Sequence, residues 1–151
     1  MTSVLGRVPA LDSAAMRTEG TFTVRSFVPT DVTPQPEITT GLPVGVATME
    51  KVFAGGVTGR AATLFTAAFD QATGVGTYVA MESFEGALDG HEGCFNFVHS
   101  ATTTGTDRLA PFFTIVPASG TGALKGITGS GGLDVDDDGT HRISFDYELP
   151  S

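Results

Sequence analysis

The feature that most constrains the fold is a pair of alternating segments, 77–88 and 93–102, joined by Asp89-Gly90-His91-Glu92. Asp-Gly between such segments is a strong hairpin signal, because both residues tolerate a positive φ angle. Strand side chains alternate between two faces, so one face of the hairpin carries one series from each strand. The two series are Tyr78, Ala80, Glu82, Phe84 and Gly86 on the first strand, and Phe95, Phe97, His99 and Ala101 on the second.

This shared face places an acid and an imidazole together. If all four connecting residues form the loop, Glu82 lies opposite His99; a two-residue loop shifts the pairs but keeps the same residues on the face. Glu82 and His99 are therefore the candidate catalytic residues, acting as general acid and base. Desolvation would raise the pKa of Glu82 and lower that of His99, whereas their pairing would favour both charges. The alternatives are a buried pair with a structural role, or a His99 that faces another subunit.

The same face carries aromatic rings that could line a ligand pocket. The candidate substrate-binding residues are Tyr78, Phe84, Phe95 and Phe97. Such rings also form ordinary hydrophobic cores. Small residues on the face, such as Ala80 and Ala101, would leave space for a ligand or accommodate large neighbours.

The rest of the chain reads as further short strands separated by turn signals. The expected strands are 20–28, 44–53, 57–69, 108–116, 130–135 and 140–149. With the central hairpin they make about eight strands, and this spacing is typical of a sandwich or barrel. Closure removes exposed sheet edges, so we predict an all-β, closed antiparallel barrel as a single domain over residues 20–151, preceded by a flexible arm over residues 1–19.

Two irregular segments interrupt this pattern. Residues 29–43 contain four prolines and form a long connection, which would serve as a lid or as passive surface cover. Residues 117–129 are rich in glycine, and Leu124 and Ile127 are expected to plug the end of the core. No helix pattern follows this segment, which argues against a phosphate-binding loop.

Charge and cysteine content limit the partners. The net charge is −9 and the eight basic residues are scattered singly, which argues against nucleic acid and anionic membranes. The single cysteine, Cys94, can form no internal disulfide, and no segment reads as a secretory signal. A cytoplasmic location is the simplest expectation.

No metal or cofactor is expected. The acidic run 134–139 resembles the start of a calcium-binding loop, but Phe145 stands where the bidentate glutamate is needed, so the run reads as a hairpin turn. Cys94 and His99 fall on opposite strand faces, which argues against zinc. Cys94 also has no evident partner for nucleophilic chemistry.

Several motifs together carry a family resemblance: GTFTVRSF, MESFEGALDGHEGCFNFVHSAT, IVPASGTGALKGITGSGGL and FDYEL. Over residues 20–149 the chain resembles a bacterial family known as domain of unknown function three-two-two-four. The SGTGALKGITG segment is also similar to the glycine-rich stretch of allene oxide cyclases and plant dirigent proteins. That similarity implies their eight-stranded barrel, which assembles as dimers or trimers and binds apolar metabolites.

Three functional hypotheses follow. The first is a cofactor-independent cyclase or isomerase of an apolar small molecule, in which Glu82 and His99 handle protons. The second is a non-catalytic carrier of such a molecule. The third is a structural or assembly module with a filled core, and a homodimer or homotrimer is expected in each case.

Overall fold

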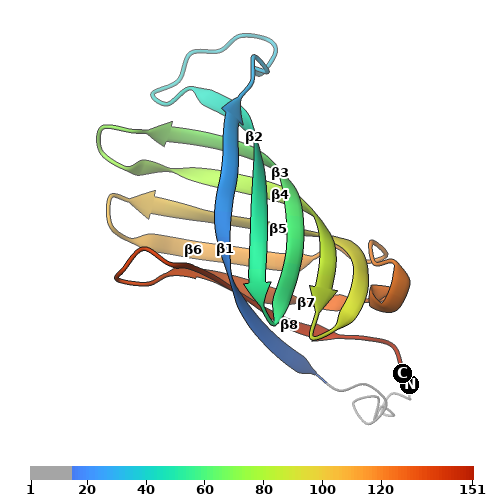
Figure 1. Cartoon of the computed structure of the whole chain (residues 1–151). Helices are drawn as coiled ribbons and strands as arrows, with labels where there is room; N and C mark the ends of the chain where they lie inside the picture. The colour runs from blue at the N-terminus through green and yellow to red at the C-terminus, as the bar shows by residue number, and fades with distance from the viewer. Residues whose placement is uncertain (1–14) are drawn as a thin grey trace, which may run out of the picture.

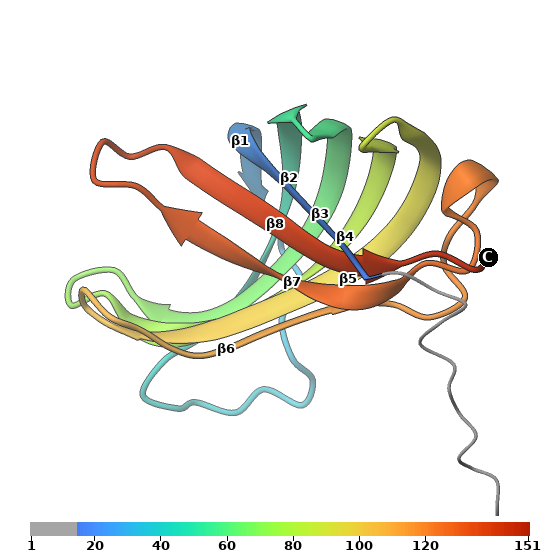
Figure 2. The same ribbon diagram turned by 90° about the horizontal axis from the view of Figure 1, so that it is seen from below.

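The computed structural model describes residues 15–151, and in them eight antiparallel strands close into a barrel in chain order. β1 pairs with β2 on one side and with β8 on the other, which completes the ring (Figures 1 and 2). The predicted all-β barrel is therefore confirmed. The elements are β1 (Met16–Pro29), β2 (Val44–Gly55), β3 (Val57–Asp70), β4 (Val75–Leu88), β5 (His91–Thr104), β6 (Arg108–Ile115), a short 3-10 helix η3 (Gly122–Leu124), β7 (Thr128–Val135) and β8 (His141–Glu148).

The central hairpin is β4–β5, and its turn contains two residues. Leu88 pairs with His91, and the turn residues Asp89 and Gly90 have φ angles of 50° and 85°. Two successive positive φ angles match the right-handed twist of the strands, which is why Asp-Gly suits this position. Of the two loop lengths considered from the sequence, the structure has the two-residue loop, so each cross-strand pair is shifted by two residues from the four-residue register.

The start of the barrel also differs from expectation. β1 begins at Met16, which pairs with Tyr147 of β8, so residues 16–19 belong to the sheet and not to an arm. Residues 1–14 of the predicted arm lie outside the described residues. The segment between β1 and β2 contains neither helix nor strand, as its prolines predict.

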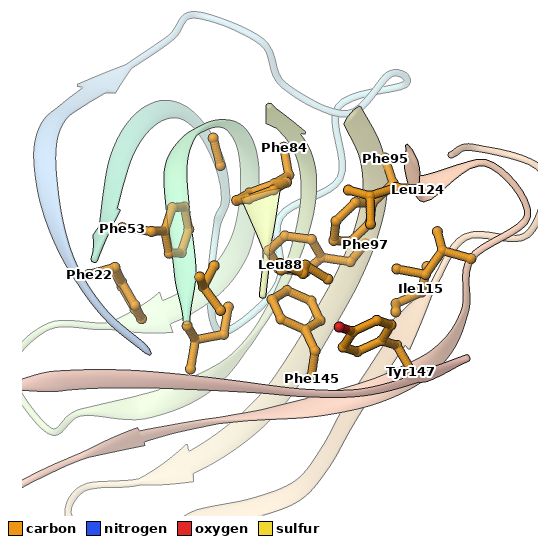
Figure 3. Close-up of a cluster of buried hydrophobic side chains, with 14 residues drawn as sticks. Phe22, Phe53, Phe84, Leu88, Phe95, Phe97, Ile115, Leu124, Phe145 and Tyr147 are labelled. Atoms are coloured by element: carbon orange, nitrogen blue, oxygen red, sulfur yellow. The ribbon is translucent and has the colours of Figure 1, made fainter. Parts of the chain in front are cut away.

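One end of the barrel is filled by a hydrophobic core (Figure 3). Leu124 and Ile127, which flank the end of η3, are fully buried there, as predicted for the glycine-rich segment. The rings of Phe95 and Phe145 meet edge to face with centroids 5.5 Å apart. The remaining large core side chains are Phe22, Phe53, Val57, Phe84, Leu88, Phe97, Ile115, Ile143 and Tyr147.

The other end is less tightly closed. β6 and β7 share a single pair, Thr114 with Ser130, and Figure 2 shows the β7–β8 hairpin diverging from β6. Bulges at Val24/Ser26 in β1 and Ser100/Thr102 in β5 add local bends. Within residues 15–151 no helix is long and apolar enough to cross a membrane. The barrel thus has one end filled by the hydrophobic core, called the base here, and one open end, called the mouth.

Candidate active site

A layer of buried polar side chains lies between the packed base and the mouth. Four neighbouring strands, β2 to β5, each contribute one inward-facing member: Lys51, Thr63, Glu82 and His99. Each is at most 5% exposed. Buried charges are costly unless they are paired and hydrogen-bonded, so their mutual contacts decide what this layer can do.

Glu82 is the acceptor at the centre of the layer. Its Oε2 atom accepts hydrogen bonds from Lys51 Nζ and from His99 Nε2, the latter at 2.7 Å. Its Oε1 atom accepts a hydrogen bond from Thr63 Oγ1 at 2.5 Å. Burial alone would raise the pKa of Glu82, but the His99 hydrogen bond and the Lys51 ammonium outweigh burial and hold that pKa below its usual range. Glu82 is therefore an ionised carboxylate whose oxygens are all engaged.

His99 connects this carboxylate to the mouth. Because ionised Glu82 can only accept, His99 Nε2 carries the proton and Nδ1 is free to accept one. Tyr78 Oη donates to that Nδ1 at 2.8 Å, and Arg108 Nη2 donates to the same hydroxyl oxygen at 3.0 Å. A continuous chain thus runs from Arg108 through Tyr78 and His99 to Glu82.

The protonation states along this chain follow from burial. Burial lowers the pKa of His99, and although Glu82 opposes the shift, the Lys51 ammonium adds to it. The ring is therefore neutral near pH 7. Burial also raises the pKa of Tyr78, partly opposed by Arg108, so its hydroxyl keeps its proton. The resting site is a phenol that donates to a neutral imidazole.

Two cavities open above the polar layer. The first, the polar cavity, has a volume of about 490 Å³, and its wall includes Lys51, Tyr78, His99, Arg108 and His141. The second, the apolar cavity, has a volume of about 430 Å³, and its wall includes Phe27, Val46, Ala67, Phe69 and Ala101. Both volumes fall within the range of small-molecule sites.

The structure separates the predicted site residues into two groups. Glu82 and His99 are brought together, but only His99 lines a cavity, because Lys51, Thr63 and His99 cover Glu82. Glu82 is therefore in contact with the polar cavity only through Lys51 and His99. Tyr78 lines both cavities.

The three predicted phenylalanines do not line the site. Phe84, Phe95 and Phe97 lie in the core cluster, at most 2% exposed, and none belongs to either cavity wall. They lie nearer the Asp89-Gly90 turn, where the barrel end is filled, so the expected pocket-lining rings are part of the packed core.

The sequence reasoning missed three site residues: Lys51, Thr63 and Arg108. Strand alternation predicts that Glu50 and Lys51 face opposite sides of β2, but alternation alone does not say which one faces inward. Phe53, two residues further on, is a core residue, so the strand period could have placed Lys51 on the inner face. Thr63 and Arg108 carried no such signal.

Comparisons with known proteins agree with this fold. The family described as "Protein of unknown function (DUF3224)" matches residues 18–147. A crystal structure of a protein with unknown function from that family, from Shewanella oneidensis MR-1, superposes with a TM-score of 0.75 and 26% sequence identity, covering 91% of this chain and 98% of that chain. A search of curated proteins finds no match. The chain belongs to the DUF3224 family.

Proposed function

We propose that the protein binds a mainly apolar small molecule in the mouth of its barrel and moves a proton at the hydroxyl of Tyr78. This is the chemistry of a cofactor-independent isomerase or cyclase. The observation that carries the proposal is the hydrogen-bonded series from Tyr78 through His99 to Glu82, with links of 2.8 and 2.7 Å. A hydroxyl, an imidazole and a carboxylate in this order form the general arrangement that activates an oxygen for proton transfer.

The proton path follows from these contacts. When Tyr78 passes its proton to His99 Nδ1, the imidazolium that forms is compensated by the carboxylate of Glu82. The phenolate left behind faces the guanidinium of Arg108, which stabilises its negative charge. The phenolate can then take a proton from an acidic C–H bond of a bound carbonyl compound, which becomes an enolate, and deliver that proton to a different atom of the enolate. His99 Nδ1 then returns its proton to the Tyr78 oxygen. The enzyme ends in its starting state, and the product is an isomer.

The surrounding aromatic rings hold this relay in one geometry. The His99 ring stacks on Phe97 and Phe113, with centroids 6.0 and 5.9 Å apart and interplanar angles of 24° and 20°. The Tyr78 ring stacks on Phe65 at 5.4 Å. Fixed rings reduce the reorganisation that accompanies the transfer, which supports a catalytic role. The similarity of the glycine-rich segment to allene oxide cyclases supports a small-molecule site of the same kind.

A non-catalytic carrier is the second candidate. It is favoured by one observation: Glu82 is fully buried and satisfied by Lys51, Thr63 and His99 without any ligand. Such a set can be purely structural, and the cavities would then serve only to hold an apolar molecule.

Replacing Tyr78 with phenylalanine tests the proposal, because the ring that stacks on Phe65 is kept and only the hydroxyl is lost. The probe is 4-phenyl-2-butanone in D2O, and NMR measures both its binding and the exchange of its α-protons. We expect the wild-type protein to accelerate exchange and Tyr78→Phe to reduce the acceleration by about 100-fold, the lower range for general acid–base catalysis.

Tyr147→Phe is the matched control, since Tyr147 is the only other tyrosine and lies in the core. It should keep full exchange activity. Binding without accelerated exchange in the wild-type protein would favour the carrier, and equal exchange by wild type and Tyr78→Phe would overturn the proton-transfer role of Tyr78.

A further inference from the structure

We infer that the two cavities are halves of one binding site, and that the ligand is an amphipathic carbonyl compound whose oxygen lies at Tyr78 and whose apolar portion fills the apolar cavity. The placement of the oxygen rests on the proposed function. The placement of the apolar portion rests on separate observations about the barrel wall.

The first observation is the partition between the cavities. Phe65 and Tyr78, together with Thr103, line both of them. The two rings stack with an interplanar angle of 14°. This stacked pair of rings is therefore a wall that the two cavities share, and a molecule bound at the Tyr78 hydroxyl is in contact with that wall.

The second observation is the difference in charge between the two walls, both of which also carry hydrophobic side chains. The polar cavity is lined by charged groups: Lys51, Asp107, Arg108 and Asp134. Within the described part of the chain, no charged side chain lines the apolar cavity, whose polar lining consists of Gln71, Thr77, Tyr78 and Thr103. A ligand that spans both would have one orientation, with its polar group on the Arg108 side.

The third observation explains why the apolar cavity exists. Inward-facing positions near the ends of four neighbouring strands carry small residues: Ala47 in β2, Ala67 in β3, Gly76 in β4 and Ala101 in β5. At the packed end, the same strands carry Phe53, Val57, Phe84 and Phe95 inside the barrel. Small side chains leave the space that large ones fill at the base, so this end can hold a ligand.

The long loop between β1 and β2 frames this cavity. Pro29, the last residue of β1, and Pro43, the last residue of the loop, both contribute to the wall. Proline at both ends fixes the φ angle of the backbone there and places apolar ring atoms against the cavity. The segment interpreted from sequence as a lid or surface cover thus contributes its ends to the proposed subsite for the apolar portion.

A series of methyl ketones from 2-pentanone to 2-undecanone tests this inference, with dissociation constants measured by NMR titration. Each added methylene buried in an apolar site strengthens binding about fourfold. We expect this gain along the series until the apolar cavity is full, and then a plateau. The key variant is Ala67→Phe, which places a ring in the apolar cavity on the strand position opposite Tyr78 and changes neither Tyr78 nor His99.

Ala62→Phe is the matched control, because it adds the same ring to the exposed outer face of the same strand. Three results together support the inference. Ala67→Phe should lose the dependence of affinity on chain length but keep 2-pentanone binding within about twofold, and Ala62→Phe should give the same series as the wild-type protein. A flat series in the wild-type protein, or an unchanged series in Ala67→Phe, overturns it.

These readouts are separate from the test of the proposed function. The ketone series measures binding and gives its answer whether or not the protein exchanges protons. Conversely, α-proton exchange of 2-pentanone that depends on Tyr78 would remain if the apolar cavity proved irrelevant. Failure of one proposal is therefore distinguishable from failure of the other.

Discussion

Glu82 and His99 are hydrogen-bonded at 2.7 Å although they are not directly opposite each other in the sheet. Glu82 faces Phe97, and His99 faces Ala80. Diagonal neighbours on one face of an antiparallel pair are within reach of long side chains, and this diagonal contact is possible because alanine stands opposite His99. The acid–imidazole contact predicted from alternation therefore persists in a register two residues away from the one first considered.

Breaking the buried ion pair should be costly. Lys51→Met leaves a buried carboxylate without its ammonium, and Glu82→Gln leaves a buried ammonium without its carboxylate; each should lower the free energy of unfolding by about 3–5 kcal/mol. The double variant should lose less than the sum of the two single losses, because it leaves no unpaired charge. Urea denaturation of the four proteins measures these differences.

The control for this cycle is Glu85→Gln on the same strand. Glu85 pairs with Arg60 on the outer face, where both side chains are more than 60% exposed. Exposed pairs contribute little, so Glu85→Gln should leave the unfolding midpoint nearly unchanged. Additive losses from Lys51→Met and Glu82→Gln would contradict the coupling.

The sequence was sufficient for the parts of this site that depend on local alternation. The Asp-Gly turn and the two alternating series on β4 and β5 were enough to predict that Glu82 and His99 share an enclosed face. Dense glycines around Leu124 and Ile127 likewise indicated a plug at the barrel end, because only small residues allow such close backbone approach.

The sequence was not sufficient for contacts that depend on register between distant strands. Lys51 reaches Glu82 across β3, and Arg108 reaches Tyr78 across β5; both contacts need the order and stagger of the whole barrel. Whether an aromatic ring lines a cavity depends on its distance from the packed end of the barrel. Phe84 and Tyr78 share a face, yet only Tyr78 is at the mouth.

Thr63 should stabilise the carboxylate state of Glu82. Thr63→Val keeps the shape of the side chain but removes the hydroxyl that donates to Glu82 Oε1. Hydrogen bonds to charged groups contribute about 1.5–3 kcal/mol, and we expect a loss of that size in the free energy of unfolding.

Thr77→Val is its matched control, since Thr77 hydrogen-bonds to Thr102 at an exposed position. It should change the unfolding midpoint much less than Thr63→Val. Equal losses in the two variants would show that the hydroxyl of Thr63 has no special role beside the buried carboxylate.

Stability should fall on acidification because of His99. Its pKa in the folded protein lies below the usual value of 6.5, first because of burial. The unfolded chain therefore binds more protons than the folded protein in this range, so the free energy of unfolding rises with pH. The stabilisation of the folded protein that arises from the lowered pKa of His99 is complete above pH 6.5 and is lost as pH falls through the lower folded-state pKa.

Urea denaturation of wild type and His99→Gln between pH 5 and pH 8 tests this sign. The free energy of unfolding should depend less steeply on pH in His99→Gln than in the wild-type protein. At pH 8 the imidazole is neutral in both the folded and the unfolded wild-type chain, so the difference between the two proteins at this pH measures only the lost contacts of the ring. Parallel curves for the two proteins across this range would contradict a depressed pKa at His99.

Asp89 links the tip of the central hairpin to two other strands. Its Oδ1 accepts a hydrogen bond from Thr18 Oγ1 of β1, and its Oδ2 accepts one from Tyr147 Oη of β8, both at 2.7 Å. Asp89 also has a φ angle of 50°, which Asp and Asn tolerate better than other side chains. This residue therefore closes the packed end of the barrel as well as forming the turn.

Asp89→Ala should lower the free energy of unfolding by about 2–4 kcal/mol, since it removes both hydrogen bonds and leaves a positive φ without a favoured residue. Asp89→Asn should lose less, because asparagine keeps the backbone preference and one acceptor oxygen. Asp138→Ala, in the exposed β7–β8 turn, serves as the control and should change thermal stability less than either. If Asp89→Ala and Asp138→Ala shift the melting temperature equally, the links from Asp89 to β1 and β8 contribute nothing beyond an ordinary turn aspartate.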